Sequence, residues 1–122
     1  MKKNRYIIIP LFILMNLLTL LSSEKIYSEN ALERSKFHFF RATERRKAGD
    51  NYGAMSDYNM VINLNAEESH VGFAYFMRSF IKSNSWGDDK GYCEDLKIAS
   101  TYNFPGRKEA QKKFNRYCVN QK

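Results

Sequence analysis

Apolar residues follow two different patterns along the chain. Between residues 6 and 21 they form an almost unbroken run, with thirteen apolar positions out of sixteen. Further on they recur every three or four residues, which is the spacing of a helix with one buried face. Three segments show this spacing: Ala54, Tyr58, Val61 and Ile62; then Tyr92, Leu96 and Ala99; then Ala110, Phe114 and Tyr117. The pattern predicts an all-α protein, and the long interval without proline between Pro10 and Pro105 favours the same class.

Two stretches of the sequence repeat each other in order. Phe39-Phe40-Arg41-Ala42 recurs 37 residues later as Phe76-Met77-Arg78-Ser79. The segment that starts at Gly49-Asp50 recurs 38 residues later at Gly87-Asp88. Glycine suits the end of a helix because it accepts a positive φ, and the aspartate after it can cap the next helix. Each copy therefore predicts two helices joined by a Gly-Asp turn.

A charged pair recurs within the two copies. Arg41 precedes Asp57 by 16 residues, and Arg78 precedes Asp95 by 17, which matches one extra residue in the second copy. Because the pair joins the two expected helices of each copy, we predict an ion pair inside each repeat. An exposed pair of this kind contributes at most about 1 kcal/mol, whereas a buried pair costs more when one partner is removed.

The N-terminal 28 residues resemble a targeting segment. A basic start, Met1 to Arg5, precedes the apolar run of residues 6–21, and small residues follow it, as in a secretory signal peptide. Ser23 and Ser28 are small enough to precede a cleavage site, although neither makes an A-x-A pattern. We expect residues 1–28 to be a signal peptide with a short linker, or an uncleaved anchor that holds the chain at a membrane through residues 6–21. In both cases the rest of the chain is exported.

Export changes the meaning of the two cysteines. In an oxidising compartment an even number of cysteines first indicates a disulfide. Cys93 and Cys118 lie at equal distances from Pro105-Gly106, a turn signal about which two helices can fold back. We therefore predict a Cys93–Cys118 bridge in preference to a metal site, since the sequence has neither CxxC nor HxxxH spacing. It would stabilise the domain by roughly 3 kcal/mol.

Charge and the remaining chemistry exclude several function classes. Net charge is +7, but three of the basic residues belong to the N-terminal start, and the cluster Arg45-Arg46-Lys47 has acidic neighbours. No nucleic-acid-binding module surrounds these residues, so no nucleic acid is expected. His38 occupies a packing position between helices, and His70 lies in the expected connection between repeats, facing solvent. No nucleophile, base and orienting group occur together, so we expect no catalytic residue, no cofactor and no metal.

The repeated pattern resembles the tetratricopeptide repeat family. Arg41-Ala42, Gly49-Asp50, Ala54, Asp57-Tyr58 and Val61-Ile62-x-Leu64-Asn65 are similar to a bacterial repeat of this type, and the second copy is similar too. Ala66, often proline in the family, and Arg45 and Lys82, at a position commonly aromatic, depart from the pattern. The resemblance implies an all-α fold with two tetratricopeptide-type helix-turn-helix repeats within residues 29–103, at about 35–66 and 69–103. A C-terminal capping helix would occupy residues 104–122.

The same resemblance implies a binding groove and not an active site. In this family ligands lie in the concave groove lined by the first helix of each repeat. The matching positions are Phe39, Thr43 and Arg46 in the first copy and Phe73, Phe76 and Phe80 in the second. These phenylalanines form a core, a contact with the N-terminal helix or a binding patch, and aromatic residues beside arginine are typical of interface anchors.

We therefore expect a protein–protein interaction or scaffold module outside the cytoplasm, with an unidentified protein or peptide as its partner. Two alternatives stay open from the sequence. One is a membrane-anchored accessory subunit of an envelope complex, which retention of residues 1–28 would favour. The other is an exported enzyme whose site has no recognised motif.

Overall fold

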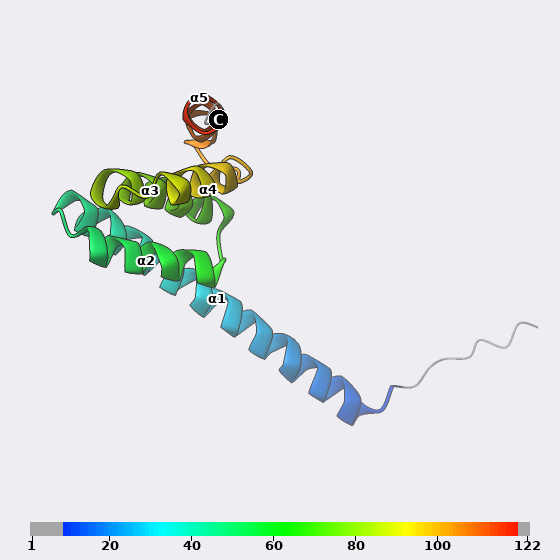
Figure 1. Cartoon of the computed structure of the whole chain (residues 1–122). Helices are drawn as coiled ribbons and strands as arrows, with labels where there is room; N and C mark the ends of the chain where they lie inside the picture. Colours follow the sequence, from blue (N-terminus) through cyan, green and yellow to red (C-terminus); the bar gives the residue numbers. More distant parts are fainter. Residues whose placement is uncertain (1–8, 120–122) are drawn as a thin grey trace, which may run out of the picture. The chain divides into compact units, whose positions relative to one another are not determined.

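The computed structural model describes residues 9–119, and these residues form five α-helices without a strand (Figure 1). The helices are α1 (Leu11–Lys47), α2 (Asn51–Leu64), α3 (Glu68–Trp86), α4 (Asp89–Ala99) and α5 (Arg107–Tyr117). The all-α class expected from the apolar spacing is confirmed. The basic start at Met1 to Arg5 and the last three residues, 120–122, lie outside the described part of the chain.

The chain divides between Asn30 and Ala31 into two units. The first unit contains residues 11–30 of α1, and all twenty of these side chains are exposed. Residues 11–28 of the expected targeting segment and linker are helical, because the sequence from Leu11 to Lys47 contains neither glycine nor proline to end the helix. No helix among residues 9–119 has an apolar stretch of the length and hydropathy needed to cross a bilayer.

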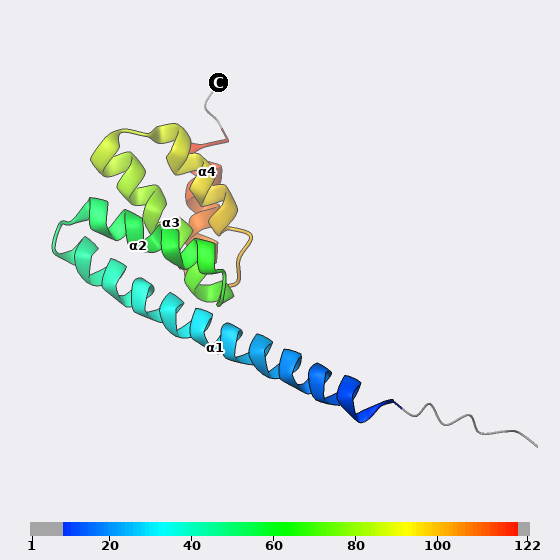
Figure 2. The same ribbon diagram turned by 90° about the horizontal axis from the view of Figure 1, so that it is seen from below.

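The second unit contains two helix pairs with matching turns. Residues 31–47 of α1 pair with α2, and α3 pairs with α4 (Figure 2). Each turn has a glycine with positive φ, 82° at Gly49 and 64° at Gly87. The aspartate that follows each glycine caps the next helix: its Oδ1 accepts a hydrogen bond of 2.8 Å from the amide of Gly53 or Gly91. The Gly-Asp turns predicted from the sequence are therefore present in both pairs.

The first core joins α1, α2 and α3. Ala42, Tyr58 and Val61 are fully buried there, and Ile81 of α3 is almost so. The 3–4 spacing of α2 thus places its apolar face against both neighbouring helices. Ile62 completes the expected stripe only in part, since it is half-buried at the edge of this core.

The second core joins α3, α4 and α5 and includes the loop between the last two helices. Phe104 of that loop is buried, with its ring 5.8 Å from the ring of Phe76. Leu96 and Ala99 of α4 and Ala110 of α5 complete the cluster. The loop is also fixed to the start of α3, because the amide of Asn103 donates a 2.9 Å hydrogen bond to Glu68 Oε1.

The C-terminal helix α5 is held by few buried side chains. Ala110 is its one fully buried residue, Phe114 is half-buried, and Tyr117 is 48% exposed, so the expected third stripe is weaker than the other two. A disulfide between Cys93 of α4 and Cys118 at the end of α5 confirms the predicted bridge. The bond closes the loop that contains Pro105-Gly106 and fastens α5 to α4.

Candidate functional site

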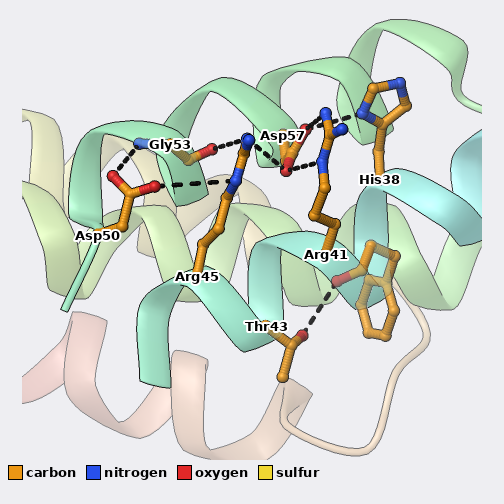
Figure 3. Close-up of polar contacts among 8 residues, drawn as sticks. His38, Arg41, Thr43, Arg45, Asp50, Gly53 and Asp57 are labelled. Carbon is orange, nitrogen blue, oxygen red and sulfur yellow. Dashed lines mark hydrogen bonds and ion pairs between the residues drawn. The ribbon is translucent and has the colours of Figure 1, made fainter. Parts of the chain in front are cut away.

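The most extensive polar cluster of the second unit surrounds Asp57, whose side chain is 1% exposed (Figure 3). Arg41 of α1 donates two hydrogen bonds to this carboxylate, from Nε to Oδ2 at 2.8 Å and from Nη2 to Oδ1 at 2.7 Å. Arg45, one helical turn later, donates from Nη1 to Oδ2 at 2.9 Å. His38 Nδ1 lies 2.8 Å from Oδ1, so with an ionised carboxylate this nitrogen carries the proton.

The cluster stabilises the charged form of Asp57. Burial by itself raises the pKa of a carboxyl group, because it disfavours the charge. Here the hydrogen bonds from Arg41 and His38, together with the positive charges of Arg41 and Arg45, outweigh burial and lower the pKa of Asp57 to about 2. Asp57 is therefore a carboxylate at neutral pH and a poor proton acceptor.

The second helix pair repeats this arrangement around Asp95, whose side chain is 3% exposed. Arg78 donates from Nε to Oδ2 at 3.0 Å and from Nη2 to Oδ1 at 2.7 Å. Lys82 Nζ lies 3.0 Å from Oδ2, in the place that Arg45 takes in the first pair. The remaining nitrogen of Arg78, Nη1, donates to Asn59 Oδ1 of α2 at 2.8 Å and so ties the second pair to the first.

The number of bonds to Asp57 decides what its cluster can do. A carboxylate has about four lone-pair positions, and Asp57 accepts four hydrogen bonds, two from Arg41 and one each from Arg45 and His38. It has no position left for a substrate or a water to be activated. We interpret the Asp57 and Asp95 clusters as structural links between the two helices of each pair.

Arg45, Lys82 and His38 are the members of these clusters that the sequence interpretation did not assign. Arg45 and Lys82 appeared only as departures at a position that is commonly aromatic, and His38 as a packing residue. The sequence does contain a pattern that indicates their role. Arg45 lies one helical turn after Arg41, and Lys82 lies one turn after Arg78, so the second cation repeats after 37 residues. A cation repeated at that spacing predicts a second bond to the repeated aspartate.

The six residues assigned to the groove differ in burial and in the contacts that they make. Phe39 and Phe73 belong to an aromatic cluster between α1 and α3, with ring centroids 5.1 Å apart. Thr43 donates its hydroxyl to the carbonyl of Phe39 at 3.0 Å, so its polar atom is used within α1. Phe76 is only 8% exposed and is a core residue, because α4, the Phe104 loop and α5 cover it.

His70 is part of the aromatic cluster and does not face solvent as expected. Its ring stacks on Phe39 with centroids 4.1 Å apart, and 16% of its side chain is exposed. The expectation failed because α3 begins at Glu68, so His70 lies in the first turn of a helix and not in a connection. Glu67 Oε2 lies 3.4 Å from its Nδ1.

Arg46 and Phe80, the other two groove residues, do come together. They line a shallow hollow of about 180 Å³ with Asn51, Ile81, Asn84 and Ser85, where the ends of α1 and α3 approach the start of α2. Ligand pockets commonly exceed about 300 Å³, so this hollow suits one side chain of a partner and not a whole small molecule. Among the described residues Arg46 has no acidic partner. At the rim of the hollow it therefore offers a guanidinium group that lies close to the Tyr58 hydroxyl but has no acidic partner in the described part of the chain.

Residues 9–119 contain no group of three His, Cys, Asp or Glu side chains placed to hold a metal ion. Comparison of the chain with family models, with curated proteins and with solved structures gave no match.

Proposed function

We propose that this chain is an exported protein–protein interaction module built from two tetratricopeptide-type repeats and a capping helix. The observation that carries the proposal is the repetition itself. Both helix pairs have the same Gly-Asp turn, the same aspartate cap and the same carboxylate clamped by an arginine and a second cation. In the described part of the chain, the buried carboxylates of Asp57 and Asp95 hold helices together, which is typical of a binding scaffold.

The disulfide supports the export in this proposal. Disulfides persist in oxidising compartments and are rare in the cytosol. The bridge between Cys93 and Cys118 is compatible with an extracytoplasmic protein, and no free cysteine accompanies it. The basic and apolar N-terminal segment has the pattern of a targeting signal for export.

The binding position that we propose is the hollow between Arg46 and Phe80. The guanidinium of Arg46, which has no acidic partner among the described residues, suits an acidic side chain of a partner, and Phe80 offers an apolar contact beside it. Asn51, Asn84 and Ser85 add polar groups at the rim, as in the polar border of many interfaces. We expect a peptide segment in which an acidic residue lies near an apolar one.

Capture of partners from the native envelope tests this position. Wild type and Arg46→Glu are used as baits, with Lys47→Glu as the matched control, since both side chains are exposed at the end of α1. Arg46→Glu should lose a partner that wild type and the control retain. Equal capture by all three baits would contradict the hollow as a binding site. Asn84→Ala provides a second, exposed probe of the same rim.

A specific observation favours a second role, that of a membrane-anchored accessory subunit. Ten large apolar side chains between Ile9 and Leu21 are 44–75% exposed, which is costly in water. Residues 6–8 of the expected anchor lie outside the described part of the chain. Mass spectrometry of the mature N-terminus decides this point: retention of residues 1–28 supports anchoring, and a start near Ser23 or Ser28 contradicts it.

A further inference from the structure

The outer side of α5 presents a ridge of positive charge, which we define as Lys108, Lys112 and Arg116. Their spacing of four residues places them along one side of the helix, away from Ala110, which faces the core. All three side chains are exposed. Among the described residues none of them forms an ion pair, since the one acidic residue of α5, Glu109, lies 3.4 Å from Lys113.

This ridge is unfavourable for the helix that bears it. Like charges four residues apart destabilise a helix, and Lys108 in the first turn opposes the helix dipole, which Arg116 in the last turn offsets only in part. The helix has little packing to offset this, because Ala110 is its one fully buried residue. A row of cations that weakens its own helix is explained if the row meets negative charge outside the chain.

The shape of the ridge restricts the kind of partner. A single exposed helix is convex, and a convex row of cations fits a broad, flat anionic surface better than an extended peptide, which needs a groove. Beside the ridge, Lys112, Lys113, Arg116 and Tyr117 line a hollow of about 40 Å³ with Glu109. That space admits a few water-sized groups, such as the oxygens of a phosphate ester.

We propose that the Lys108–Lys112–Arg116 ridge docks electrostatically onto the anionic lipid headgroups of a membrane. In the chain that retains residues 1–28, the ten exposed apolar side chains of residues 9–21 suit a lipid environment and favour lipid over another polyanion. The proposal goes beyond the interaction role of the Arg46–Phe80 hollow and does not depend on it. Each cation near an anionic surface contributes about fivefold to binding, so the three together contribute on the order of a hundredfold.

A fluorescence experiment on the full chain tests this docking separately from insertion of the N-terminal segment. Trp86 is the one tryptophan of the sequence, so Trp86→Phe with Asn115→Trp places a single reporter on the exposed side of α5. Vesicles with a nitroxide quencher on a lipid headgroup are prepared from phosphatidylcholine alone or with added phosphatidylglycerol. We expect the reporter to be quenched only in the anionic vesicles and to recover at high ionic strength, because salt screens exposed charges.

Charge-matched variants identify the residues responsible. Lys108→Gln/Lys112→Gln/Arg116→Gln should weaken docking on the order of a hundredfold. The control, Lys47→Gln/Lys90→Gln/Lys97→Gln, removes the same charge from exposed sites on α1 and α4 and should retain docking. Equal loss in both triple variants, equal quenching in neutral and anionic vesicles, or no quenching in either would overturn the proposal. So would a reporter that responds to soluble polyglutamate but not to anionic vesicles, which would indicate an acidic protein as the partner.

Discussion

Arg41 holds Asp57 through both oxygens of its carboxylate, at 2.8 Å from Nε and 2.7 Å from Nη2. This two-bond geometry joins α1 to α2 at a side chain that is 1% exposed, while the guanidinium itself is partly in solvent. Hydrogen bonds to charged groups are the stronger ones in proteins, and paired arginine–carboxylate bonds also fix geometry. The interaction therefore fixes the angle and register of the first helix pair.

The stability of the second unit should depend on the ionisation of Asp57. Its pKa is lowered from 3.8 to about 2 in the folded chain, so its contribution is fully present above pH 4 and is lost as the pH falls through about 2. A shift of nearly two units corresponds to about 2 kcal/mol of unfolding free energy. Urea unfolding followed by circular dichroism at pH 6 and pH 2 measures this contribution.

Other acidic groups also titrate in this range, so the test uses a difference between variants. Asp57→Asn removes the ionising group, and its stability deficit relative to wild type should shrink by about 2 kcal/mol between pH 6 and pH 2. Glu94→Gln, at an exposed site on α4, provides the control for the loss of one carboxylate outside the clusters. A deficit of Asp57→Asn that does not change with pH would contradict the role assigned to the ionised carboxylate.

The repeated features of this fold could be predicted from the sequence because each follows from local chemistry. Glycine and aspartate at 49–50 and 87–88 specify a turn and a helix cap without reference to distant residues. The disulfide followed from two cysteines placed symmetrically about Pro105-Gly106. The two arginine–aspartate spacings of 16 and 17 residues also indicated which side chains meet, and the structure places both pairs in contact.

The burial of the residues assigned to the groove was not predictable in the same way, because it depends on how helices pack. Phe76 and Phe80 are four residues apart and share a helix face in sequence, yet Phe76 is in the core and Phe80 borders a hollow. The difference arises from Phe104, whose loop folds over α3 and covers Phe76. Phe104 lies in a loop, where apolar residues do not recur with a helical spacing, so the apolar pattern of the sequence could not indicate that it is buried.

Ser35→Ala should stabilise the second unit. The hydroxyl of Ser35 is fully buried in α1 and has no hydrogen-bond partner among the described residues. An unsatisfied buried hydroxyl is unfavourable, and alanine also has the higher helix propensity, so we expect a gain of about 1 kcal/mol. Thermal unfolding of both proteins measures it as an increase in Tm.

A second buried serine gives the matched control for this gain. Ser79 is equally buried but donates its hydroxyl to the carbonyl of Phe76 at 2.6 Å. Ser79→Ala therefore loses a hydrogen bond together with the hydroxyl and should gain clearly less than Ser35→Ala. Equal effects of the two substitutions would contradict the assignment of an unsatisfied group at Ser35.

Removal of the disulfide should destabilise α5 before the rest of the second unit. The bridge closes a loop of 25 residues, for which the chain-entropy model gives about 3 kcal/mol. Because α5 buries little else, Cys93→Ser/Cys118→Ser should raise amide exchange in residues 107–117 more than in α2 or α3. Exchange that rises uniformly through α2–α5 would indicate that α5 unfolds only together with the core.

Gly72→Ala should destabilise the contact between α3 and the loop before α5. A Cβ at this position would lie 2.7 Å from atoms of both Phe104 and Tyr102, closer than side chains tolerate. Forcing extra volume into a packed core costs about 1–3 kcal/mol, which urea unfolding measures directly. The losses of unfolding free energy from Gly72→Ala and Phe104→Leu should be less than additive, because leucine at position 104 is smaller than phenylalanine and relieves part of the overlap. Full additivity in this double-mutant cycle would show that the cost does not arise from overlap with the Phe104 ring.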